Sequence, residues 1–237
     1  LLMTLRLKAP PGGRLAPQQA EHALQARIIM MMRSPLALYA AVALILNLAF
    51  AQVEASFVLV LRDYLGFGAR ETGWLFTYVG VCIVLVQAVL IRHMVKRLGE
   101  VGTMGFGSLL LIIGQALTVL AVIGLLPGSD YPLVQTVIAT TAICFGFALA
   151  SPALSSAASK IAGSSSRGGS LGVVQGFASF GQVIGLVAAG PFYDLGGTQY
   201  PFAFGVAVMI GLLALLPWLA RPEAVSYTHL RAHETNQ

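Results

Sequence analysis

Long runs of apolar residues, separated by short polar segments, dominate this chain. Six of the runs contain 19 residues or more, and they cover residues 36–61, 73–91, 104–126, 132–151, 171–189 and 201–219. About 20 apolar residues are enough for a helix to cross the hydrocarbon core of a bilayer. A bilayer offers the backbone no water to bond, which favours helices for segments of this length. The pattern therefore predicts an all-α, polytopic membrane protein with six transmembrane helices.

The charged residues predict which side of the membrane each loop faces. Only 10% of the 237 residues are charged, whereas a soluble domain has about 25%. Eleven Lys and Arg residues fall on one side of the predicted helices, against Arg62 and Arg70 on the other. By the positive-inside rule, both natural ends of the chain face the cytoplasm from the inner (plasma) membrane. The net charge of +5 then reflects topology, and we expect no nucleic-acid partner.

Both ends of the chain differ from its apolar middle. Residues 1–33 are polar and begin with Leu, and we expect them to be a cytoplasmic central linker before a six-helix bundle over residues 34–224. Residues 225–235 read VSYTHLRAHET, which is the translation of a common transposase-type sequencing adapter. We therefore expect residues 225–237 not to be native, and we do not interpret His229 and His233 as metal ligands.

Two stretches of the sequence carry a resemblance to a known family. LRDYLGFGARETGWLFTYVGVCIVLVQAVLIRHMVKRLGE (residues 61–100) resembles helices seven and eight of the major facilitator superfamily, and SSSRGGSLGVVQGFASFGQVIGLVAAGPFYDLGG (residues 164–197) resembles its tenth loop and eleventh helix. The resemblance implies the C-terminal six-helix half of a transporter, with an N-terminal six-helix half as its missing partner. Among the branches, the chain is most similar to drug–proton antiporters of the tetracycline-exporter-like group.

The loop after the second predicted helix can be compared with a family motif, G-x-L-x-D-R-x-G-R. Arg97 and Gly99 match its R-x-G, whereas the other motif positions differ. The resemblance implies a gating role for Arg97 in this loop, together with Gly99. The alternative is that Arg97 and the neighbouring basic residues only anchor the loop on the cytoplasmic side.

The fifth predicted helix combines glycines with a polar stripe. Gly172 and Gly176 are four residues apart, as are Gly181 and Gly185, and the two pairs lie on different faces where other helices can approach closely. Three polar residues fall within about 60° of each other on the helical wheel: Gln175, Ser179 and Gln182. Unpaired amides in hydrocarbon cost several kcal/mol, so this stripe is predicted to line an aqueous cavity. The alternative is hydrogen bonding between helices.

The first predicted helix contains Asn47 and, seven residues later on the same face, Glu54. Glu54 is the one acidic residue well inside any predicted span, and it is a candidate for binding a proton or a cationic substrate. The alternative is an ion pair with Arg62 or Arg70 near the outer end. Further cavity-lining candidates are Gln87, Thr136 and Thr140. Hydroxyls that bond back to their own helix are the alternative for the two threonines.

The two cysteines, Cys82 and Cys144, both fall inside predicted spans. A disulfide framework is therefore not indicated, and we interpret both as small packing residues.

These observations predict a secondary transporter that exports a small, drug-like organic molecule by alternating access, with protons as the driving ion. A facilitator-type importer of a metabolite or sugar is the alternative within the same class. The competing class is an integral-membrane enzyme or sensor, but the sequence lacks the H-E-x-x-H, G-x-S-x-G, P-loop and dinucleotide motifs. We expect a small-molecule substrate, protons and the lipid bilayer as partners, with no cofactor and no metal.

Overall fold

A computed structural model of the chain describes residues 36–127, 130–161 and 163–234. The predicted linker, residues 1–33, lies outside the described residues. All elements in the described ranges are helical, as the apolar runs predict: α2 (Leu36–Leu65), α3 (Ala69–Leu85), a π-helical segment η1 (Val86–Leu90), α4 (Ile91–Val122), α5 (Pro132–Ile161), α6 (Gly163–Gly196) and α7 (Gln199–Glu234). The prediction of an all-α membrane protein is confirmed.

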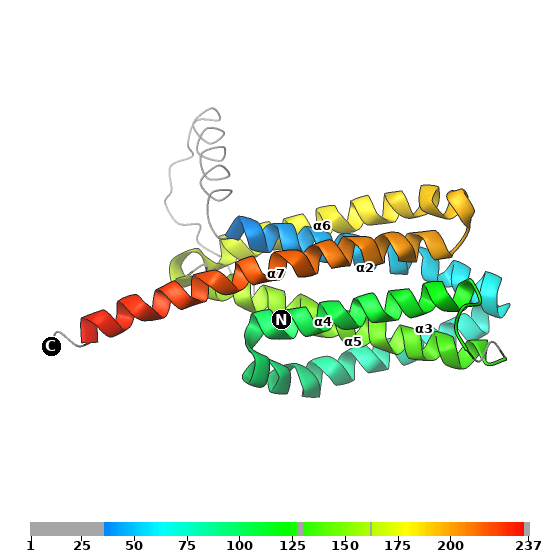
Figure 1. Cartoon of the computed structure of the whole chain (residues 1–237), viewed down its shortest axis with the longest axis horizontal. Helices are drawn as coiled ribbons and strands as arrows, with labels where there is room; N and C mark the ends of the chain where they lie inside the picture. Colours follow the sequence, from blue (N-terminus) through cyan, green and yellow to red (C-terminus); the bar gives the residue numbers. More distant parts are fainter. Residues whose placement is uncertain (1–35, 128–129, 162, 235–237) are drawn as a thin grey trace, which may run out of the picture.

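Five continuous helical runs in the described ranges are long and apolar enough to cross a membrane. One of them, Ala69–Val122, has 54 residues and reverses direction at Gly99, whose backbone has φ 70° and ψ 178° (Figure 1). Its two arms, residues 69–98 and 100–122, are about 45 Å and 35 Å long at 1.5 Å per residue. Each arm is long enough to cross the hydrocarbon core. The chain thus supplies the six crossings that the sequence predicts.

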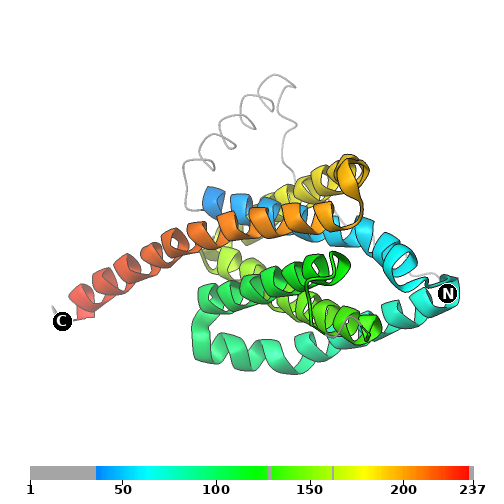
Figure 2. The same cartoon turned by 45° about the vertical axis from the view of Figure 1, so that its right-hand side comes forward.

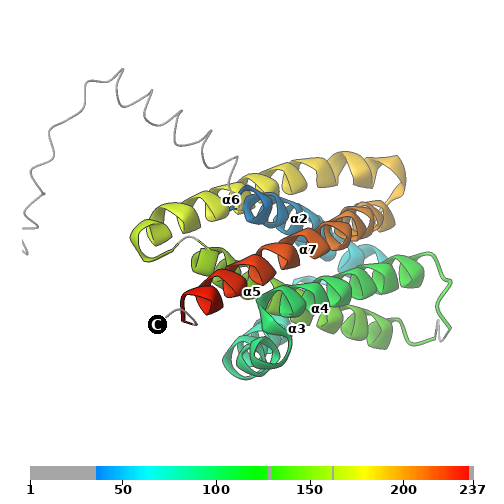
Figure 3. The same cartoon turned by 60° about the vertical axis from the view of Figure 1, so that its left-hand side comes forward.

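The helices pack as two close pairs that α7 joins. The most extensive contacts are those of α4 with α5 and of α2 with α6, and α7 contacts both α4 and α2. Turned by 60° from the view of Figure 1, the bundle shows α6 and α2 on one side, α4, α5 and α3 on the other, and α7 between α2 and α4 (Figure 3). A stacked ring pair, Phe50 and Phe147 with centroids 3.7 Å apart, connects α2 to α5 between the two groups.

The surface of the bundle is apolar and unevenly covered. Trp74, Val187 and Trp218 are more than 60% exposed, as expected for side chains that face lipid. The most apolar stretch is 56% buried in α2 and 50% in α5, but only 22% in Gly168–Gly196 of α6. Much of α6 is therefore left uncovered by this chain. Figure 2 shows that α7 continues past the bundle to Glu234.

Candidate functional site

A hydrogen bond between a carboxylate and an amide joins α2 to α6 within the apolar stretches of both helices. Gln182 Nε2 donates to Glu54 Oε2 at 2.9 Å. The side chain of Glu54 is exposed and that of Gln182 is half-buried. The sequence singles out these two residues separately, and the structure places them together. An exposed carboxylate that is held by an uncharged donor keeps lone pairs free for a proton or another donor.

Two glycines explain why α6 comes close enough to α2 for this bond. A Cβ atom added at Gly185 would lie 2.5 Å from the carbonyl oxygen of Leu48, and one added at Gly181 would overlap the carbonyl oxygen of Leu44. Any larger side chain at either position would push the helices apart. The glycine pair therefore sets the distance across which Gln182 reaches Glu54.

A second amide in the same interface is not among the residues that the sequence analysis singles out. Gln52 is fully buried, and its Nε2 donates to the carbonyl oxygen of Gly185 at 2.7 Å. Its Oε1 is buried and has no hydrogen-bond partner in the described part of the chain. A lone glutamine two residues before Glu54 was visible in the sequence. The role of Gln52 depends on which helix packs against it, and the residues next to it in the sequence do not show which helix that is.

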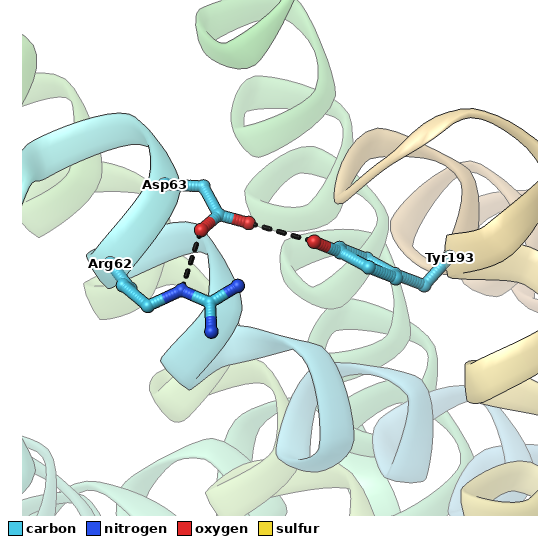
Figure 4. Close-up of polar contacts among 3 residues, drawn as sticks. All are labelled: Arg62, Asp63 and Tyr193. Atoms are coloured by element: carbon cyan, nitrogen blue, oxygen red, sulfur yellow. Dashed lines mark hydrogen bonds and ion pairs between the residues drawn. The ribbon is translucent and has the colours of Figure 1, made fainter.

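The C-terminal ends of α2 and α6 are joined by a third polar contact (Figure 4). Asp63 Oδ1 pairs with Arg62 Nε at 2.7 Å, and Tyr193 donates its hydroxyl hydrogen to Asp63 Oδ2 at 3.0 Å. Arg62 is thus engaged by the adjacent carboxylate, whereas Glu54 is engaged by Gln182. This arrangement does not supply the Glu54–Arg62 ion pair that is the alternative interpretation of Glu54.

The remaining cavity-lining candidates fall into two groups. Gln175 and Ser179 are exposed on the uncovered side of α6, and Gln87 is exposed within the π-helical segment η1. The other three are less accessible. Two of them donate a hydrogen bond to their own helix, Asn47 Nδ2 to the Ala43 oxygen at 2.8 Å and Thr136 Oγ1 to the Pro132 oxygen at 2.9 Å. The third, Thr140, is buried. Lining of a cavity stays a prediction for all six.

The two glycine pairs of α6 differ in their surroundings. Gly181 and Gly185 contact the backbone of α2, as described above. A Cβ added at Gly172 or Gly176 would meet no atom of the described chain within 4 Å. Close approach at Gly172 and Gly176 stays a prediction, which would require a partner outside this bundle.

The turn between the two arms of the 54-residue run contains a buried acid that the apolar pattern does not single out. Gly99 takes the left-handed φ of 70° that reverses the chain, and Arg97 just before it is exposed. Glu100, which follows Gly99, is 7% exposed. It forms an ion pair with Lys160 and accepts a hydrogen bond from Ser156 Oγ at 3.4 Å. The acid therefore connects the start of the second arm to the C-terminal end of α5, while the gating role of Arg97 stays a prediction.

A bundle of apolar helices that are long enough to cross a membrane defines the class as a polytopic membrane protein. The model of the Major Facilitator Superfamily matches residues 4–236, nearly the whole sequence. The chain belongs to this superfamily, which groups it with transporters rather than with enzymes.

The sequence is also similar to a protein that is known by name. The chain is 28% identical over 178 residues to Multidrug resistance protein 1 of Bacillus subtilis (strain 168). The alignment covers 75% of this chain and 43% of that protein, so the chain spans less than half the length of the relative it matches.

Proposed function

We propose that the whole protein exports a small, drug-like organic molecule across the plasma membrane, driven by proton entry. The observation that carries this proposal is the exposed carboxylate of Glu54, bonded to Gln182 across the α2–α6 interface. Similarity to a multidrug resistance protein supports a drug-like substrate and the direction of export. The proposal includes the predicted topology, in which both natural ends lie in the cytoplasm.

The uncovered side of α6 supports alternating access. Gln175 and Ser179 are exposed there, and polar side chains in a membrane helix avoid lipid because hydrocarbon cannot bond them. We infer that a second six-helix half, outside this chain, covers this side and leaves an aqueous cavity between the halves. Rocking of one half against the other would expose the cavity to each side of the membrane in turn.

The chemistry that we assign to Glu54 is reversible protonation coupled to substrate release. A charged carboxylate accepts the hydrogen bond of Gln182 and favours an open, hydrated cavity. Closure of the cavity removes water and favours the neutral acid, because desolvation disfavours the charged form. A proton taken up on the outer side, where the substrate leaves, would thus be carried inward when the empty transporter returns.

The test uses the full-length protein in sealed proteoliposomes with an imposed pH gradient and a fluorescent, lipophilic probe compound. We expect the wild type to concentrate the probe against its gradient, and Glu54→Gln to lose this uphill movement but keep downhill exchange. Glutamine at position 54 can still accept the Gln182 bond, so the helix contact is retained. Asp194→Asn, at the exposed outer end of α6, is the matched control and should transport normally.

Two outcomes would contradict the proposal. Uphill transport that is indifferent to collapse of the pH gradient would exclude proton coupling. Accumulation toward the cytoplasmic side would favour the importer of a metabolite or sugar.

A further inference from the structure

Two buried cysteines lie on α3 and α5, which are in contact with each other, in a part of the bundle that the proposed function does not use. The described residues of α3 include two buried ones, Leu75 and Cys82, so Cys82 lies on the face that packs on the bundle. Cys144 of α5 is also buried, at 4% exposure. Both thiols are free, and they are the two cysteines of the sequence.

The contacts on either side fix the register of the two helices. One turn before the thiols, the hydroxyls of Tyr78 and Thr141 are 2.7 Å apart. One turn after them, Val86 belongs to the same small buried cluster as Ala148 and Leu149. The two helices run in the same direction, since α3 and α5 both start at the outer side. Cys82 and Cys144 therefore occupy the turn between two contacts that are already made, and we place them opposite each other.

The local chemistry agrees with this placement. Both thiols are buried, and the residues one turn further along the two helices, Val86 and Ala148, are buried and apolar. A pair of sulfur ligands surrounded by apolar groups suits a soft metal ion rather than a hard one. The charge decides which soft ion fits best. Two thiolates around a divalent ion give a neutral adduct, which a low-dielectric interior tolerates, whereas a monovalent ion would leave a net negative charge.

We propose that Cys82 and Cys144 form a two-coordinate site for a soft divalent cation of the mercuric type, which bridges α3 to α5 when it binds. Binding replaces the two S–H bonds with two S–metal bonds and releases two protons to solvent, with no change of oxidation state. The bridge would hold α3 against α5 and restrict any movement of one helix along the other. This proposal is independent of the proposed transport function.

The test measures mercury retention by the purified full-length protein. The protein is incubated with mercuric chloride, a neutral and membrane-permeant form, and then washed with an excess of a monothiol that strips singly bound mercury. The double variant Cys82→Ser/Cys144→Ser is the blank, and we expect the wild type to retain one mercuric ion more than the blank. Cys82→Ser and Cys144→Ser should each retain no more than the blank. Retention by either single variant at the level of the wild type would overturn the proposal.

A second measurement reports the bridge itself and does not depend on the strength of binding. A protease site inserted between α4 and α5 separates the fragment with Cys82 from the fragment with Cys144. After treatment with mercury, blocking of free thiols and cleavage, the two fragments of the wild type should run together on a denaturing gel without thiols. They should separate when a dithiol is added. Fragments that separate without the dithiol would show that the thiols do not face each other.

Discussion

The bundle contains two close helix pairs, α2 with α6 and α4 with α5. The two pairs are alike in their glycine contacts but differ in the polar side chains of their interfaces. In both pairs glycines bring backbones into contact. The α2–α6 interface also contains the side-chain contacts of Gln52, Glu54 and Asp63. In the middle of the α4–α5 contact Gly107 and Gly146 lie against each other, with a Cβ at either one 2.6 Å from the other's carbonyl oxygen. The Glu100–Lys160 ion pair of this helix pair lies away from these glycines, at the start of α4 and the end of α5.

The difference separates a structural contact from a candidate functional one. Small residues that allow close backbone packing stabilise helix association in membranes without any polar group. A pair that also contains a carboxylate and two amides has a further requirement, because each polar group needs a partner or water. We interpret α4–α5 as the scaffold and α2–α6 as the pair whose polar contacts can change with protonation.

The largest effect is expected from a single methyl group in the α4–α5 contact. The change Gly146→Ala would place a Cβ 2.6 Å from the Gly107 oxygen and 2.6 Å from the Leu111 nitrogen. Both neighbours are backbone atoms, which cannot rotate away, so the cost should be at or above the upper end of overpacking, about 3 kcal/mol. Thermal unfolding in detergent measures this loss. An unchanged melting temperature would show that α4 and α5 are not in contact at these glycines.

A somewhat smaller effect is expected on α6, where the chain offers an internal control. Gly181→Ala would clash with the Leu44 carbonyl, whereas Gly176→Ala would meet nothing within 4 Å in this chain. Both changes raise helix propensity equally, so their difference reports packing alone. Because the clash at Gly181 is also with backbone, we expect Gly181→Ala to destabilise by up to about 3 kcal/mol relative to Gly176→Ala. Equal melting temperatures in the full-length protein would mean that a second helix bundle packs on Gly176 as closely as α2 packs on Gly181.

A substitution of Gln115, on the side of α4 that contacts α7, is expected to raise the stability of the protein and not to lower it. Its side chain is fully buried, and neither amide atom has a hydrogen-bond partner in the described ranges. The amide lies over Gly205 of α7, where a Cβ would overlap it. Because an unpaired buried polar group costs about 1–3 kcal/mol, Gln115→Met, of similar length, should raise stability by about 1 kcal/mol. A drop in the melting temperature would instead reveal a bound water or another partner of the amide.

The sequence predicts the helices well because hydrocarbon imposes one requirement on every segment. In hydrocarbon the backbone of each apolar run has to satisfy its own hydrogen bonds, which favours a helix. Each of the six runs is helical over most of its length. The reversal between the second and third crossings also depends on local information, since a left-handed φ at Gly99 costs a glycine little.

The candidate site was predictable only in part. Glu54 and Gln182 stand out as polar residues in apolar runs, but their bond depends on how α6 is rotated and shifted against α2. The same holds for Gln52 and for Glu100, whose partner Lys160 is 60 residues away. Periodicity gives the face of a helix, not the neighbour of that face. The reciprocal contact of Gly107 with Gly146 was missed for this reason, since each glycine is ordinary within its own helix.

The smallest effect is expected for the hydrogen bond between Tyr193 and Asp63, near the C-terminal ends of α6 and α2. Tyr193→Phe removes the hydroxyl that donates to Asp63 and leaves the ring in place. Asp63 keeps its pair with Arg62, and water can replace the lost donor at this exposed end. The change in stability should therefore be no more than about 0.5 kcal/mol, the low end for a hydrogen bond. Tyr200→Phe, at the start of α7, is the matched control. A loss of stability well above that of the control would mean that the Tyr193–Asp63 hydrogen bond contributes as much to the α2–α6 contact as the glycines do. The polar contacts of this pair would then have to be counted as part of the scaffold.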